Sequence, residues 1–200
     1  TARQTGNRQI EANSLAELGR IMGTWLGQSE AGKAYFAEAM PIVRELGDQR
    51  ALSFILRQLG NIAYHEGDAQ AAEGYIVESV AIAKEIGDRQ AEAAGINSLG
   101  NVERSKGDLS AALERFKESL EVARQLGNRG MQSMILTNMS HSYNRLREID
   151  EAMRTARQSY ELAVEGGSDY LISGGHYVLG AAFLRQGRLD EARKHLKESA

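Results

Sequence analysis

Four short segments of this chain resemble one another and lie forty residues apart. They read LGNIAY, LGNVER, MSHSYN and LGAAFL, and they begin at Leu59, Leu99, Met139 and Leu179. A fixed internal period of this length is the signature of a repeat architecture, in which each unit buries its apolar face against its neighbours. The period therefore predicts an array of similar units rather than a single globular core.

Glycines recur at two places in each period. The first set is Gly27, Gly67, Gly107 and Gly187, with Arg147 in the fourth place; the second set is Gly47, Gly87, Gly127 and Gly167. Glycine accepts the positive φ at which helices commonly end. An Asp or Asn after many of these glycines, as at Asp88 and Asp108, can cap the next helix. Each unit is therefore predicted to hold two antiparallel helices, for example over 89–106 and 109–126.

Small residues also recur inside the predicted helices. The first helix carries Gly19, Gly60, Gly100, Ser140 and Gly180, and the second carries Gly32, Ala72, Ala112, Ala152 and Ala192. A glycine in mid-helix costs about 1 kcal/mol relative to alanine, so its recurrence predicts that another helix packs closely there. Two irregularities fall in the first unit: one extra residue between Gly19 and Gly27, and Pro41, which is expected to free the carbonyl of Ala37 and kink its helix.

The pattern resembles the tetratricopeptide repeat. The matching residues are Leu56-Leu59-Gly60, Ile96-Leu99-Gly100, Leu136-Met139-Ser140-Tyr143 and His176-Leu179-Gly180-Phe183 in the first helix, and Ala112-Phe116-Ser119 and Gly32-Phe36-Ala39 in the second. The period of forty and the missing proline at the end of the second helix resemble the long-repeat variety found in kinesin light chains, spindle-orientation adaptors and large bacterial regulators. The resemblance implies an all-α, right-handed α-solenoid of five helix-turn-helix repeats.

The repeats are expected to form one array over residues 1–200, with approximate bounds 8–47, 48–87, 88–127, 128–167 and 168–200. TARQTGNR at the start resembles VARQLGNR at 122–129, so residues 1–7 are predicted to be the tail of a second helix whose own repeat lies upstream. LKESA at 196–200 resembles FKESL at 116–120, so the last helix stops short. The chain is therefore interpreted as a fragment of a longer solenoid, and its uncapped ends favour a homodimer.

Composition and motifs argue against several classes of function. The net charge of −3 gives no basic surface for nucleic acid. The longest apolar run, 177–184, is far shorter than the roughly 20 residues of a membrane span. The chain has no cysteine, its four histidines lack metal-ligand spacing, and the glycine-rich segment from Glu165 lacks a phosphate-loop ending. We therefore expect no enzyme activity, catalytic residue, metal or cofactor, and no nucleic-acid or membrane partner, with a cytoplasmic location.

The groove is where the resemblance implies function, because the first helix of each repeat lines the concave side of such arrays. The 25 positions that the family uses there hold five arginines and no acid, although 27 residues of the chain are acidic. They include Ser53, Met134 and Tyr177. The groove site predicted from this set is Arg57, Asn61, Tyr64, Asn97, Asn101, Arg104, His141, Asn144 and Arg145.

A groove with arginines and without acids favours an acidic partner, because guanidinium groups bind carboxylates through paired hydrogen bonds. Asparagines offer both a donor and an acceptor to a peptide backbone. The predicted function is a protein-interaction scaffold that binds an acidic peptide or protein segment in this groove. The alternatives are a ligand-sensing segment, or a structural spacer, of a larger bacterial signalling or transcriptional regulator.

Overall fold

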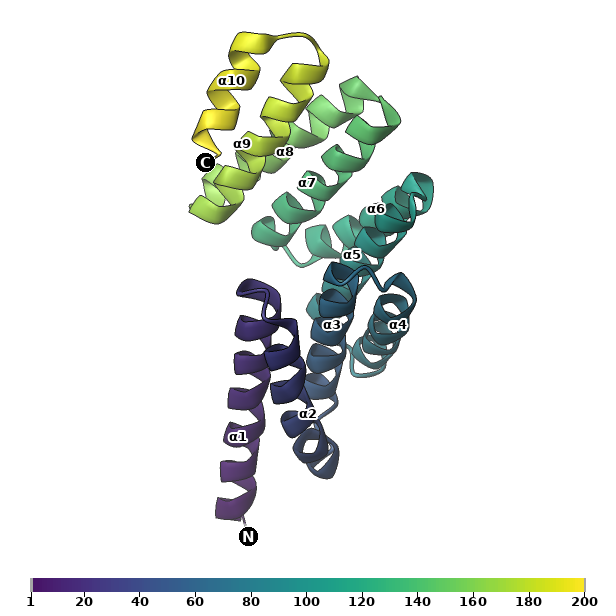
Figure 1. Ribbon diagram of the computed structural model, residues 1–200, viewed down its shortest axis with the longest axis vertical. Helices are drawn as coiled ribbons and strands as arrows, with labels where there is room; N and C mark the ends of the chain where they lie inside the picture. Colours follow the sequence, from purple (N-terminus) through teal and green to yellow (C-terminus); the bar gives the residue numbers. More distant parts are fainter. Residues whose placement is uncertain (1, 200) are drawn as a thin grey trace. The chain divides into compact units, whose positions relative to one another are not determined.

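The computed structural model describes residues 2–199, and every regular element in that range is helical. The helices are α1 (Ala2–Arg20), η1 (Ile21–Trp25, a π-helix), α2 (Ser29–Leu46), α3 (Gln49–His65), α4 (Ala69–Glu85), α5 (Arg89–Lys106), α6 (Leu109–Gln125), α7 (Arg129–Leu146), α8 (Ile149–Gly166), α9 (Asp169–Arg185) and α10 (Leu189–Glu198). Short turns join consecutive helices into helix-turn-helix pairs, as Figure 1 shows for α3 with α4 and for α7 with α8. The predicted all-α class is confirmed.

The chain divides into two compact units, Thr1–Val102 and Glu103–Ala200, which we call unit 1 and unit 2. Unit 1 has one hydrophobic cluster around Phe36 and Ile55 and a second around Ile76, and all three residues are fully buried. In unit 2, Phe116 and Val178 are equally buried. No described helix is both long and apolar enough to cross a bilayer. The bounds of the five repeats over residues 1–200 stay a prediction.

The predicted helix ends are confirmed. Every glycine of the two sets has a positive φ, between 63° and 89°, and Arg147 takes the same left-handed conformation at 64°. The carboxylates of Asp48, Asp68, Asp88 and Asp108 each accept a hydrogen bond from the backbone amide three residues later, at 2.9–3.0 Å. These caps satisfy amides that a helix start leaves without a partner.

Arg147 provides the first testable prediction, because a side chain in the left-handed region costs about 1–2 kcal/mol. Glycine would remove this strain, but it also increases the conformational entropy of the unfolded chain, which offsets part of the gain in stability. Arg147→Gly is therefore expected to stabilise the chain by about 0.5–1 kcal/mol in urea unfolding. The reverse change at the matching turn, Gly187→Arg, should destabilise it; two variants shifted in the same direction would contradict the strain at Arg147.

The extra residue of the first repeat is absorbed by the π-helix. The amide of Leu26 donates to the carbonyl of Ile21 at 2.9 Å, a bond across five residues in place of four. Such a bulge holds one additional residue without ending the helix. Gly23, inside this turn, is buried against Gly32 of α2. The insertion is thus accommodated where two glycine backbones touch.

Close helix approach is confirmed at the small residues. A methyl group added to Gly60 would collide with Ile76 and the carbonyl of Ala72 in α4. In the last hairpin, a methyl on Gly180 would lie 2.7 Å from Leu196. Pro41 lies inside α2, which continues to Leu46, so the expected break does not end the helix.

Buried serines join the two helices of a hairpin, a feature that sequence analysis missed. Ser53, one of the predicted groove positions, is only 1% exposed. Its hydroxyl donates to the carbonyl of Ser79 at 2.9 Å, and the hydroxyl of Ser79 donates to the carbonyl of Ser53 at 2.7 Å. Ser133 and Ser159, eighty residues on, make the same pair of bonds. The assignment of Ser53 to the groove was therefore wrong. The sequence does contain a sign of these buried bonds, because a serine recurs every forty residues at 79, 119, 159 and 199.

The prediction for the first residues was also wrong in part. Residue 1 lies outside the described residues, but α1 runs without interruption from Ala2 through Gly6 and Asn7 to Arg20. A helix turn like that at Gly127 and Asn128 is therefore absent at Gly6 and Asn7. Glycine permits the left-handed conformation but does not require it, so the likeness of the two segments does not fix a turn.

Candidate functional site

Four of the nine predicted groove residues meet in one pocket of unit 2. Arg104, His141, Asn144 and Arg145 line a hollow of about 370 Å³ together with Asn138, Ala181 and Arg185. The contributing helices are the end of α5, the second half of α7 and the end of α9. His141, Asn144 and Arg145 share one face of α7 because they are three and four residues apart. We call this hollow the arginine pocket.

The arginine pocket carries three guanidinium groups and no acid in its lining. One arginine is fixed in place: Nη1 of Arg145 donates to the backbone carbonyl of Arg104 at 3.0 Å. Within the described residues, no ion pair joins Arg145 or Arg185 to a carboxylate. Clustered like charges repel one another, and an anion placed among them relieves the repulsion. The chemistry of the pocket is thus suited to a carboxylate.

His141 reinforces this character while remaining neutral. Burial, and then the positive charge of Arg104, lowers the pKa of His141 from its ordinary 6.5 to about 4. Its ring lies 5.5 Å from the ring of Tyr177, at an angle of 42°. At neutral pH the imidazole therefore offers a hydrogen bond and an aromatic contact rather than a charge.

The lowered pKa predicts how stability depends on pH. Between pH 6.5 and about 4 the unfolded chain binds a proton at His141 that the folded chain does not, so stability falls as the pH falls through this range. The full loss corresponds to about 3 kcal/mol. His141→Gln should flatten the pH dependence of urea unfolding between pH 6.5 and about 4. Equal pH dependence in wild type and His141→Gln would contradict the assignment.

Asn144 is the least satisfied polar group of the pocket. Its side chain is 8% exposed, and neither Nδ2 nor Oδ1 has a hydrogen-bond partner among the described residues. An unpaired buried amide costs about 1–3 kcal/mol. A ligand with a peptide group would satisfy both atoms, because a peptide bond supplies one donor and one acceptor.

The other five predicted residues belong to unit 1 and lie on two helices. Arg57, Asn61 and Tyr64 follow one face of α3, and all three are half-buried. Asn97 is buried and Asn101 half-buried on α5. The guanidinium of Arg57 lies 5.7 Å from the ring of Phe54, and burial, then the charge of Arg20, lowers the pKa of Arg57. Arg57 is therefore packed against its own helix more closely than a freely exposed arginine would be.

The predicted site does not include three residues of the pocket, which are Asn138, Ala181 and Arg185. Arg185 is one of the five arginines at the groove positions, but the predicted site takes its arginines from the three middle repeats only. Asn138 gave no signal, since it precedes the apolar position of Met139 and falls outside the groove positions of the family. Of the other histidines, His176 is paired with His195 through their Nδ1 atoms at 2.9 Å. Over the described residues no three of His, Asp or Glu are grouped to hold a metal.

Hairpins of this kind, repeated every forty residues, define a helical repeat protein. The sequence model "Tetratricopeptide repeat" matches residues 51–125 and 90–165, which together exceed half of the chain. The chain belongs to the tetratricopeptide repeat family. A second family model, "Anaphase-promoting complex subunit 5", matches residues 14–66.

Solved structures share this fold at low sequence identity. A Rap protein complexed with Competence and Sporulation Factor has a TM-score of 0.78 and 13% identity, over 94% of this chain and 62% of that chain. BtubC (BKLC) from P. vanneervenii has a TM-score of 0.69 and 16% identity, over 99% of this chain and 89% of that one. A signal transduction ATPase with a tetratricopeptide repeat sensor, from Pyrococcus horikoshii, has a TM-score of 0.73 and 15% identity, over 96% of this chain and 30% of that one.

This chain thus spans less than two thirds of the Rap and ATPase chains that it resembles. No curated protein matches its sequence. At these identities the structures show the fold alone. The coarse function follows from the family: the chain is an interaction scaffold of tetratricopeptide repeats.

Proposed function

We propose that this chain binds an acidic segment of a partner protein, and that an Asp or Glu side chain of the segment enters the arginine pocket. Arg145 and Arg185 supply charge-assisted hydrogen bonds to the carboxylate, with Arg104 beside them. His141 supplies a neutral hydrogen-bonding group. Unit 1 keeps its own predicted binding residues, which are Arg57, Asn61, Tyr64, Asn97 and Asn101.

The unpartnered amide of Asn144 carries the proposal. Clustered arginines alone can be a solvated surface, but a buried amide without partners in the same pocket favours a ligand that hydrogen-bonds. The pocket volume of about 370 Å³ suits one or two residues of a peptide rather than a whole domain. An acidic residue with its own backbone satisfies both the guanidinium groups and the amide.

Among the structures with this fold, one Rap protein is complexed with Competence and Sporulation Factor. A bound factor on a related fold supports ligand binding by a repeat array as such. The chemistry proposed here comes from the arginine pocket and not from that complex.

The test is a titration of fluorescein-labelled peptides followed by fluorescence anisotropy. An acidic peptide, Gly-Glu-Gly-Glu-Gly-Glu-Gly, is compared with its lysine counterpart at 50 and 500 mM NaCl. Only the acidic peptide should bind, and its affinity should fall about tenfold at the higher salt. The distance over which salt screens a charge shortens from about 10 Å at 0.1 M ionic strength to about 3 Å at 1 M. Equal affinity for the two peptides would contradict the proposal.

The sensor alternative predicts a different result in the same assay. The related ATPase has a tetratricopeptide repeat sensor, and the arginine pocket is small enough to take an organic acid. If free glutamate or citrate displaces the labelled peptide at concentrations close to the peptide's own dissociation constant, the pocket recognises a small anion. If displacement needs at least tenfold more, the peptide backbone contributes and the scaffold function is supported.

A further inference from the structure

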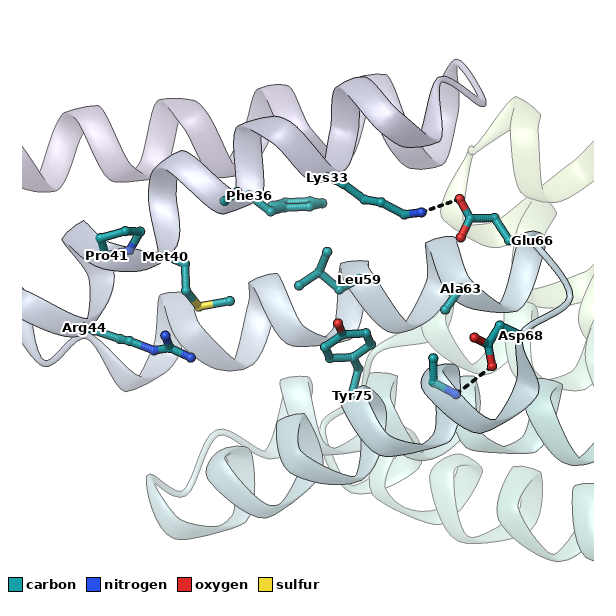
Figure 2. Close-up of a pocket in the computed structure, with 12 residues that line it drawn as sticks. Lys33, Phe36, Met40, Pro41, Arg44, Leu59, Ala63, Glu66, Asp68 and Tyr75 are labelled. Carbon is teal, nitrogen blue, oxygen red and sulfur yellow. Dashed lines mark hydrogen bonds and ion pairs between the residues drawn. The ribbon is translucent and has the colours of Figure 1, made fainter.

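A second hollow, of about 550 Å³, lies in unit 1 between α2 and α4, with α3 as its floor. Figure 2 shows Phe36 and Met40 reaching down from α2, Leu59 and Ala63 on α3, and the ring of Tyr75 rising from α4. Lys33 closes one end through an ion pair with Glu66 at 2.7 Å, and Arg44 and Pro41 lie toward the other end. We call this hollow the α2–α4 pocket.

The forty-residue period shows why the hollow exists. Ala63 occupies a position that the later repeats fill with larger side chains: Glu103, Tyr143 and Phe183. Tyr143 and Phe183 are each 7% exposed, so in unit 2 an aromatic ring is buried at this position. A methyl group in place of such a ring leaves a space of aromatic size on the floor of the α2–α4 pocket.

The surroundings of the two rings in unit 2 correspond to the walls of the pocket in unit 1. Burial raises the pKa of Tyr143, and among the nearby charges that act on it are Lys117, Glu148 and Glu151. These three residues are the counterparts, eighty residues on, of Ala37, Asp68 and Ala71, which all line the α2–α4 pocket. Tyr143 therefore occupies, in its own repeat, the space that is open in unit 1.

Phe183 gives the same correspondence in the last repeat. Its ring stacks on His195 at 5.4 Å between centroids. His195 is the counterpart of Tyr75, 120 residues earlier, which lines the α2–α4 pocket and is 39% exposed. A ring placed above Ala63 would meet Tyr75 as Phe183 meets His195, and aromatic pairs at such distances are favourable.

Two polar groups of the pocket indicate the chemistry of the ligand next to the ring. The guanidinium group of Arg44 has no hydrogen bond or ion pair with another described residue, and it borders the pocket. Pro41 has no amide hydrogen, so the carbonyl of Ala37, another lining residue, lacks its usual helical donor. A carboxylate suits Arg44, and a backbone N–H suits the carbonyl. Both belong to a polypeptide rather than to a purely apolar ligand.

We propose that the α2–α4 pocket binds an aromatic side chain of a partner polypeptide, flanked by an acidic residue that pairs with Arg44. The ring takes the place that Tyr143 and Phe183 take in unit 2. This site lies in unit 1, apart from the arginine pocket, and it does not rest on the proposed function above.

The test uses protein with ¹³C-labelled alanine and methionine methyl groups and two dipeptide probes, Ac-Phe-Glu-NH₂ and Ac-Ala-Glu-NH₂. The phenylalanine probe should shift the methyl signals of Ala63 and Met40 saturably, with a dissociation constant of about 1–10 mM, as expected for a fragment of this size. The alanine probe should bind at least tenfold more weakly. Absence of shifts at Met40 up to 50 mM probe, or equal shifts with both probes, would overturn the proposal.

Two variants place the probe in the pocket. Ala63→Phe introduces the residue found at the counterpart position 183, so it should fold with unchanged helicity and abolish the response of Met40. Arg44→Gln should weaken Ac-Phe-Glu-NH₂ about threefold to tenfold and leave Ac-Phe-Gln-NH₂ unaffected. A folded Ala63→Phe protein that still binds the probe with wild-type affinity would refute the site. Replacing Arg104, Arg145 and Arg185 by Glu should leave the response of Met40 intact, which separates this site from the arginine pocket.

Discussion

Replacing Gly32 with alanine is expected to destabilise the chain by about 1–2 kcal/mol, although alanine stands at the same position in the four later repeats. A methyl group at Gly32 would lie 2.5 Å from Cα of Gly23 and 2.9 Å from the carbonyl oxygen of Gly19. Both atoms belong to the backbone, so no side-chain rotation relieves the collision. Overpacking of this kind costs about 1–3 kcal/mol or more, which outweighs the gain of about 1 kcal/mol in helix propensity.

Gly74→Ala is the matched control. Gly74 is also in the middle of a helix, α4, and a methyl group there meets no atom within 4 Å. This variant should therefore stabilise the chain by about 1 kcal/mol through propensity alone. Urea unfolding followed by circular dichroism measures both changes. Stabilisation by Gly32→Ala would show that η1 and α2 are not in close contact at Gly23.

The sequence predicted the helix boundaries well because the repeat reports each boundary several times. The helix expected over 89–106 is α5, and the one expected over 109–126 ends one residue earlier, at Gln125. Arg147 takes the left-handed conformation of the glycine series in which it stands, against its own residue type. A single glycine is a weaker sign of a helix end, and for that reason the helix end predicted at Gly6 was wrong.

The site was predicted less completely, because the position of a residue within the repeat does not specify which side chains surround it or bond to it. The period placed His141, Asn144 and Arg145 on one face, and the structure adds that Arg185 joins them in one pocket. The period could not distinguish Ser53, whose hydroxyl is buried in a hydrogen bond from α3 to α4, from the polar residues around it. It also could not show that the amide of Asn144 lacks a partner, since that depends on side-chain packing.

Replacing Arg104, Arg145 and Arg185 together by Glu is expected to weaken binding of an acidic peptide by about 100-fold or more. Hydrogen bonds to charged groups contribute about 1.5–3 kcal/mol each, and two such losses exceed a factor of 100 in the dissociation constant. Arg145 and Arg185 have no carboxylate partner among the described residues, so the substitutions break no ion pair at these two positions. The fold should survive, as checked by helicity and urea unfolding.

A control with the same change in net charge separates the pocket from the general field of the protein. Arg115, Arg124 and Arg193 are exposed and lie on the second helices of their hairpins, α6 and α10. Their replacement by Glu makes the protein equally more negative, but it should weaken binding of the acidic peptide less than tenfold, since exposed charges at a distance are screened.

The most direct test of the central claim, that the arginine pocket recognises acidic side chains, is an exchange of charge between the pocket and its ligand. Affinities of the glutamate and lysine peptides are measured for wild type, for the pocket variant and for the control variant at 50 mM NaCl. The account predicts that wild type and the control variant prefer the glutamate peptide, and that the pocket variant prefers the lysine peptide. A pocket variant that still binds the glutamate peptide with wild-type affinity would contradict it.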